Sequence, residues 1–270
     1  MNNPTKRGIL VMACCMGAGL SQASVAADAT GTTVANAIID WSNLQLSVTG
    51  INDTVPTIAY SNQYTSLSSY ASSPGLNESN SKTVNNWTEG AGTNADAGTT
   101  SANTVASTMS FSGMANSSEN GSASSSGSRT LNFSLDGPGL LTVTVPYTIS
   151  LTGSTSGCYY YCYDYDHASV SGSANFYSYG DNGNSDSYSS TSFSLYSSPW
   201  DPSPPESQSG TLVFGVFANG AGNGSLGLSF DLSTGAASMV PETKTYAMLL
   251  AGLGLMGAVI RRRRMMGTQA

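Results

Sequence analysis

Residues 131–151 read LNFSLDGPGLLTVTVPYTISL, and this stretch decides which fold class the sequence predicts. Apolar and polar residues alternate on both sides of segment 136–139, DGPG, which has the composition of a tight turn. A period of two places the apolar side chains on one face of a β-strand. We therefore predict two half-buried strands that the turn joins into an antiparallel hairpin.

The same alternation recurs along the chain. Residues 211–217 and 226–232 alternate in this way, and the Gly- and Asn-rich segment 218–224 between them predicts a second hairpin. Between the two ends of the chain we find no long amphipathic helix. The sequence therefore predicts an all-β antiparallel sandwich, with a jelly roll as a candidate topology. Shorter alternating runs are found at residues 44–48, 109–111 and 193–195.

Much of the remaining sequence is rich in Ser, Thr, Asn and Gly and shows no sustained apolar period. Segments 116–128 and 181–190 have the composition of long loops, and segment 53–101 is predicted to be a long decorated loop. Closely spaced prolines in segment 199–205 predict an extended linker. The sandwich is therefore expected to carry long Ser/Asn/Gly-rich loops.

The first 27 residues have the order of a secretory signal peptide. Lys6 and Arg7 precede an apolar run at 8–20, and small residues follow up to Ala27, near which cleavage is expected. This predicts passage through the translocon and cleavage by signal peptidase. An uncleaved anchor and a lipidated Cys14 are the alternatives.

Three elements follow one another near the other end of the chain. Residues 240–243, VPET, precede an apolar segment at 246–260, and Arg261, Arg262, Arg263 and Arg264 follow directly. The apolar segment would span about 22 Å as a helix, a marginal length for a bilayer core of about 30 Å. Arginines resist translocation, so a transmembrane helix at 246–260 would stop there and leave the body outside.

This arrangement at residues 238–264 resembles the PEP-CTERM family of bacterial surface proteins, in which a Pro-Glu-Pro signature precedes a short membrane helix and arginines. Val240, Pro241 and Glu242 match the start of the sorting signal, and Thr243 stands where the family has its second proline. The resemblance implies recognition by an exosortase, which passes the body to the cell surface or exopolysaccharide. An ordinary tail anchor would show the same apolar run and arginines.

The exported body is acidic and almost free of basic residues. Between Asp28 and Pro241 there are 15 acidic residues, and the basic ones are Lys82 and Arg129, which gives a net charge of −13. Without a basic patch there is nothing to neutralise phosphates, so nucleic acid is excluded as a partner.

Segment 158–167, CYYYCYDYDH, is the densest cluster of chemically active side chains and holds the chain's one histidine, His167. In an exported protein Cys158 and Cys162 are expected to form a disulfide, with a zinc site as the weaker alternative. The alternating tyrosines offer flat faces for stacking on sugars, or else form one packed face of a strand. These tyrosines are Tyr159, Tyr161, Tyr163 and Tyr165.

Other candidate sites carry less information. Asp181 and Asp186 flank a glycine and supply oxygen ligands for calcium, although a solvated turn is the plainer interpretation. Segment 222–227 formally matches the dinucleotide-binding fingerprint, but we interpret it as a false positive because no βαβ unit surrounds it. No nucleophile elbow accompanies His167, so we expect neither catalytic residues nor a required cofactor.

The sequence thus predicts a signal peptide at 1–27, an exported β-rich body at 28–237 and a sorting tail at 238–264. The leading hypothesis is a non-catalytic structural protein of the cell surface or extracellular matrix, associated with exopolysaccharide in a biofilm. The alternative is a carbohydrate-binding module that uses the cluster Tyr159–Tyr165. A secreted glycan-active enzyme is the third hypothesis, because a pair of carboxylates across a cleft cannot be seen in sequence.

Overall fold

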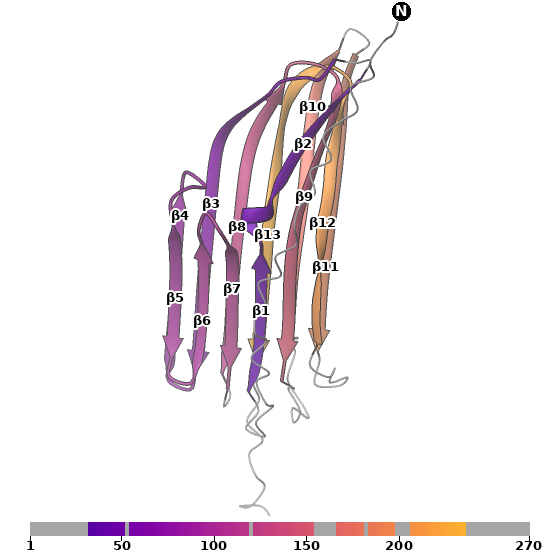
Figure 1. Ribbon diagram of the computed structural model, residues 1–270. Helices are drawn as coiled ribbons and strands as arrows, with labels where there is room; N and C mark the ends of the chain where they lie inside the picture. Colours follow the sequence, from indigo (N-terminus) through magenta and orange to yellow (C-terminus); the bar gives the residue numbers. More distant parts are fainter. Residues whose placement is uncertain are drawn as a thin grey trace, which may run out of the picture.

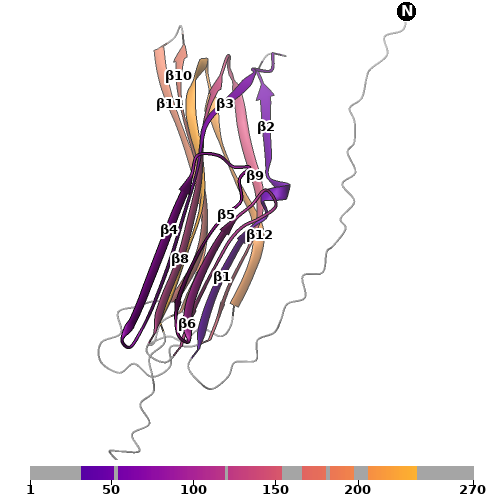
Figure 2. The same ribbon diagram turned by 90° about the vertical axis from the view of Figure 1, so that its left-hand side faces the viewer.

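The computed structural model describes residues 32–51, 54–118, 121–153, 166–180, 183–197 and 206–235. These residues form two antiparallel sheets that pack face to face as an elongated sandwich (Figures 1 and 2). The prediction of an all-β antiparallel sandwich is therefore confirmed, while the jelly roll stays a prediction. The predicted signal peptide, linker 199–205 and C-terminal helix lie outside the described residues.

The two sheets draw their strands from the whole length of the described chain. The seven-stranded sheet has the order β12-β9-β1-β7-β6-β5, and β2 also pairs with β9. Its strands are β1 (Thr33–Ile39), β2 (Gln45–Gly50), β5 (Ala91–Ala97), β6 (Thr100–Ala106), β7 (Phe111–Ser117), β9 (Gly139–Thr152) and β12 (Glu206–Ala218). The six-stranded sheet has the order β11-β10-β13-β8-β3-β4. Its strands are β3 (Ile58–Ser73), β4 (Leu76–Val84), β8 (Ser122–Leu135), β10 (Asp166–Gly180), β11 (Gly183–Ser197) and β13 (Ala221–Gly235).

Strands β1 and β2 lie one after the other along β9, separated by the short 3-10 helix η1 (Trp41–Asn43). The break is opposite Pro146, whose carbonyl accepts a hydrogen bond from the Asp40 N–H at 2.9 Å. In an antiparallel ladder the N–H and the C=O of one residue point to the same neighbouring strand. The N–H that Pro146 lacks would therefore have pointed to the interruption between β1 and β2, where no strand partner is needed. A proline is thus accommodated in a central strand.

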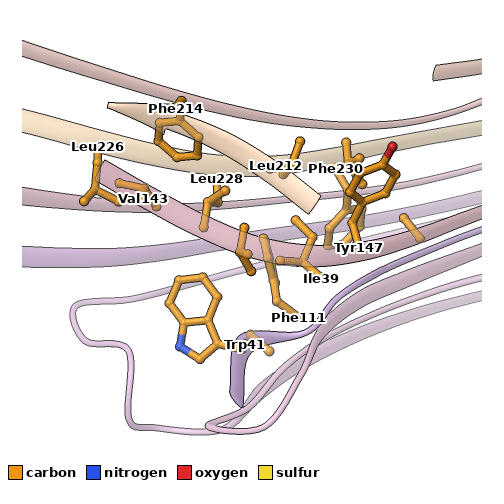
Figure 3. Packing of buried hydrophobic residues seen from close by; sticks show 14 of the residues in the cluster. Ile39, Trp41, Phe111, Val143, Tyr147, Leu212, Phe214, Leu226, Leu228 and Phe230 are labelled. Atoms are coloured by element: carbon orange, nitrogen blue, oxygen red, sulfur yellow. The ribbon is translucent and has the colours of Figure 1, made fainter. Parts of the chain in front are cut away.

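The core lies between the sheets and is filled by alternate side chains of both (Figure 3). Phe111 of β7 and Phe230 of β13 pack with ring centroids 4.8 Å apart. They fit because Gly113 has no side chain, since a Cβ there would lie 2.3 Å from Cε2 of Phe230. Large rings on one sheet therefore lie against glycines on the other.

The part of the sandwich formed by β3, β5, β6 and β8 has a core of small and hydroxyl-bearing side chains. Ser69 Oγ lies 2.7 Å from Thr93 Oγ1 and 3.0 Å from Thr104 Oγ1, which is 2.7 Å from Ser125 Oγ. All four residues are buried and come from both sheets. This network satisfies polar groups that would otherwise be costly to bury.

Arg129 of β8 is fully buried in the core. Its guanidinium carbon lies 4.2 Å from the centroid of the Trp41 ring, and Nη2 donates to the carbonyl of Ser107 at 3.0 Å. Within the described residues, Nε and Nη1 have no hydrogen-bond partner and no carboxylate forms an ion pair with the group. Burial lowers the pKa of Arg129 to about 10. Aromatic rings, not an acid, therefore surround this cation.

Both predicted hairpins are wrong in one respect: their strands exist but lie in different sheets. The DGPG segment leads from β8 in the six-stranded sheet to β9 in the seven-stranded one, and β12 and β13 are divided in the same way. Each connection is therefore an arch across the core. In an arch the apolar faces of the two strands oppose each other through side chains, so the alternation looks the same as in a hairpin.

The predicted long loops are also largely wrong. Segment 53–101 contains β3, β4, β5 and the start of β6, and segment 116–128 includes the end of β7 and the start of β8. Residues 183–190 belong to β11. The connection predicted at 218–224 shrinks to residues 219–220, because β12 ends at Ala218 and β13 begins at Ala221. The inward residues of the strands in these segments are mostly Ala, Ser, Thr and Gly, so buried and exposed positions differ little in hydropathy.

Candidate functional site

Most of the site residues predicted from sequence lie outside the described part of the chain. These residues are Cys158, Cys162, Tyr159, Tyr161, Tyr163, Tyr165, Asp181, Val240, Pro241, Glu242 and Arg261–Arg264. Asp186 lies within it, on β11 opposite Tyr177 of β10, and is exposed. It belongs to a regular ladder, and because Asp181 lies outside the described residues, the calcium interpretation stays a prediction.

The solvent-facing side of the six-stranded sheet, called here the outer face, carries an ordered array of hydroxyl groups. Strand register aligns these side chains in rows that cross all six strands, because every second residue points outward. One row consists of Ser192, Ser171, Ser229, Ser128, Ser66 and Thr83. The next consists of Ser194, Ser169, Asp231, Ser126, Ser68 and Ser81.

Exposed tyrosines lie on the outer face on both sides of these rows, toward each end of the strands. Tyr177 and Tyr179 of β10 pack edge to face with centroids 4.9 Å apart, near the highly exposed Tyr188 of β11. Tyr70 of β3 and Tyr196 of β11 lie toward the opposite end. The face thus combines hydroxyl groups with flat aromatic rings.

Few charges interrupt the outer face. His167 Nε2 lies 2.7 Å from Asp231 Oδ2, on neighbouring strands. This is a surface pair of an imidazole and a carboxylate, on an open sheet. Among the described residues, no group of three or more His, Cys, Asp and Glu side chains gathers to hold a metal ion.

A pocket of about 480 Å³ lies at the edge of the same sheet. It is called here the edge pocket, and its lining residues are Tyr60, Ser61, Asn62, Gln63, Tyr64 and Asn85. The register of β3 against β8 shifts between Ser61 and Gln63, so Asn62 is the extra residue of a β-bulge, with φ at 48°. Asparagine tolerates this left-handed conformation better than most side chains.

The bulge places the two pocket tyrosines on different sides of the sheet. Tyr60 pairs with the buried Phe133 and so faces inward, whereas Tyr64 pairs with Thr130 and faces outward. Tyr60 is nevertheless 47% exposed, Tyr64 is 45% exposed, and burial raises the pKa of Tyr60 above 10.0. Sequence analysis missed this site because it expected a loop here. The sequence signal for it was segment 60–64, YSNQY, in which two tyrosines flank a serine and two carboxamides.

The family models match one part of the sequence. The model described as the PEP-CTERM protein-sorting motif matches residues 240–264. The chain carries a PEP-CTERM sorting motif. The match includes Val240, Pro241 and Glu242 as well as the four arginines, so the resemblance proposed from these residues is confirmed. No curated protein and no solved structure matches the chain.

The PEP-CTERM motif indicates where the chain is sorted. Such tails are recognised by exosortase-type sorting enzymes, and they imply export and surface- or membrane-associated sorting. The chain is therefore an exosortase-targeted surface protein. Within residues 32–235, the described part contains no helix long and apolar enough to cross a membrane, and the predicted span at 246–260 lies outside it.

Proposed function

We propose that the exported body is a non-catalytic structural module of the extracellular matrix, which holds neutral polysaccharide on the outer face of its six-stranded sheet. The observation that supports this most strongly is the pair of rows, composed of hydroxyl-bearing residues except for Asp231, that cross the whole sheet between exposed tyrosines. The sorting motif supports the same destination, because it directs the chain to the surface.

The chemistry of the outer face suits a sugar polymer. Each hydroxyl both donates and accepts hydrogen bonds, as sugar hydroxyls do, and tyrosine offers an apolar face together with a polar hydroxyl. A single such contact is weak because water competes for it. Strands about 4.8 Å apart repeat the contact across the sheet, and repetition converts weak contacts into avidity.

The solvent-facing side of the seven-stranded sheet differs in kind. Its exposed large side chains are aliphatic or lack a hydroxyl, for example Met114 of β7, Val213 of β12 and Phe217 of β12. These side chains cannot offer a stacking surface and a hydrogen bond together, as tyrosine can. We therefore assign polysaccharide binding to the six-stranded sheet.

Two matched substitutions test this assignment. Ser171 Oγ lies 2.7 Å from Ser229 Oγ on the outer face, and Thr148 Oγ1 lies 3.0 Å from Ser209 Oγ on the solvent side of the other sheet. We expect Ser171→Lys to lower retention of the protein on the producing cells' insoluble neutral polysaccharide by about tenfold, because a long charged side chain interrupts the rows. Thr148→Lys should leave retention unchanged.

Retention is measured by co-sedimentation, and circular dichroism of each variant shows whether the fold is kept. Equal retention of Ser171→Lys, Thr148→Lys and the unmodified protein would contradict the assignment. The non-catalytic part is tested in the same tubes by assaying reducing ends, where we expect no sugar to be released. Release that disappears in a His167→Ala variant would instead support the glycan-active enzyme.

A further inference from the structure

The edge pocket has no role in the function proposed so far. We propose that it is a terminal subsite for a neutral saccharide, which holds a sugar residue between Tyr60 and Tyr64 at the free edge of β3. This inference rests on the proposed function for its ligand class. It names a separate site with its own residues, so the two can fail independently.

The pocket exists because β4 covers only part of β3. Strand β4 pairs with residues 65–73 of β3, and among the described residues no strand pairs with residues 58–64 on that side. Trp87 lies where the part of β3 that pairs with β4 meets the part that does not. Its indole Nε1–H donates to the carbonyl of Tyr64 at 3.2 Å. The backbone N–H of Trp87 also donates to Gln63 Oε1 at 3.3 Å. This bond fixes the Gln63 amide and leaves its NH₂ group to donate to a ligand.

The β-bulge gives the pocket its two aromatic sides. In a regular strand Tyr60, Asn62 and Tyr64 would share one face, because side chains alternate. The extra residue Asn62 reverses the alternation, so the two phenols flank the strand edge from opposite sides of the sheet. A pyranose ring at the edge can therefore meet an aromatic ring on each side, and the amides can bond its hydroxyl groups.

The lining defines the chemistry of the ligand. It consists of two phenols, three carboxamides and one hydroxyl, and contains no Asp, Glu, Lys or Arg. Such groups both donate and accept hydrogen bonds without charge, so they suit a neutral polyhydroxyl compound. A volume of about 480 Å³ is within the usual range for small-molecule sites.

A peptide strand added to the edge is the competing ligand class. Pairing of that kind needs a continuous row of backbone groups, and the bulge with its left-handed Asn62 interrupts this row. Bulges protect free edges from such pairing. The geometry therefore favours the saccharide.

The pocket also continues onto the outer face. Ser61 of the pocket pairs with Asn132, and this register extends through Ser225 and Asn175 to Tyr188 on the far edge strand. The row crosses four interstrand spaces, or about 19 Å. A polysaccharide chain that begins in the pocket can thus run across the strands over hydroxyl and amide groups and end on an exposed tyrosine.

The test uses neutral trisaccharides of glucose, xylose and N-acetylglucosamine, titrated calorimetrically into the mature protein recovered from producing cells. We expect at least one to bind, and Tyr60→Ala and Tyr64→Ala each to weaken its affinity at least tenfold. Phe217→Ala is the matched control: Phe217 is an aromatic side chain, 50% exposed on the solvent-facing side of the seven-stranded sheet, to which no binding is assigned. Its affinity should equal that of the unmodified protein.

Unchanged affinity in both pocket variants, or no binding of any trisaccharide, would overturn the proposal. Binding of an extended uncharged heptapeptide, lost in the same two variants and seen without trisaccharide binding, would assign the edge to peptides instead. If Ser171→Lys lowers polysaccharide retention while the pocket variants bind normally, only the pocket fails. If the pocket variants lose trisaccharide binding while Ser171→Lys keeps full retention, only the assignment of the outer face fails.

Discussion

Replacing Gly172 with alanine should destabilise the sandwich, because this glycine makes room for an aromatic ring of the opposite sheet. Gly172 lies in β10, and a Cβ there would be 2.2 Å from Cε1 of Phe214, which is buried in β12. The ring has to move within a filled core, and overpacking of this kind costs about 1–3 kcal/mol. We expect the free energy of unfolding to fall by about 2 kcal/mol and Tm by roughly 4–8 °C.

Gly227 of β13 provides the control, because it pairs with Ser173, the neighbour of Gly172. A Cβ at Gly227 would lie 3.6 Å from Ser173 Oγ, an ordinary contact, so Gly227→Ala should be neutral or stabilise by up to about 1 kcal/mol. The assay is urea unfolding followed by circular dichroism. The double variant Gly172→Ala with Phe214→Leu should lose less stability than the two single losses added together. Equal stability of Gly172→Ala and Gly227→Ala would refute the reasoning.

Two further predictions concern the buried cation and the tail. Arg129→Met should leave the free energy of unfolding within about 1 kcal/mol of the original or above it, because methionine fills the space without a desolvated charge, whereas Arg129→Ala should lose about 3 kcal/mol. Equal losses in urea unfolding would show instead that the charge itself holds the aromatic cluster together. Intact mass spectrometry of protein from the cell surface and medium should give termini near Asp28 and within 241–243, and a mass that retains Arg261–Arg264 would contradict processing by an exosortase.

The strands that sequence analysis recognised are those whose inward residues are large. Strand β9 buries Leu141, Val143 and Val145, and β13 buries Leu226 and its apolar successors, so the period of two is plain in each. Strand β5 also alternates perfectly between buried and exposed positions. Its inward residues are Ala91, Thr93, Ala95 and Ala97, which differ little in hydropathy from their neighbours, so no period stands out.

Partner choice could not be predicted even where the strands could. The turn at 136–139 joins two alternating strands, and both a hairpin and an arch place apolar residues on one side of each. A hairpin and an arch differ in whether the two strands hydrogen-bond to each other within one sheet or pack against each other across the core. In the structure Asp136 bonds to Thr57 at the start of the β3 segment, with Thr57 N–H donating to Asp136 Oδ1 at 2.6 Å. That contact is 79 residues distant in sequence, so the local pattern does not contain it.

The edge pocket illustrates the same limit at a site. Tyrosines four residues apart, as in 60–64, would share a face of a regular strand, so the sequence alone gives no reason to expect rings on opposite sides. The inversion depends on the one-residue bulge at Asn62, which is defined by the partner strand β8. Bulges are set by pairing and not by the bulged residue alone.

The serine-rich composition that suggested loops is what builds the outer face. Because arches send successive strands to opposite sheets, the six-stranded sheet collects segments as distant as β4 and β13. Serine side chains are short, so they leave a surface whose level changes little from strand to strand, and their hydroxyl groups repeat with the spacing of the ladder. Longer polar residues such as Lys or Glu would add charge and mobility at each position. A sequence that reads as low complexity therefore produces an ordered, nearly uncharged plane, which is the surface where we propose that a repetitive polymer binds.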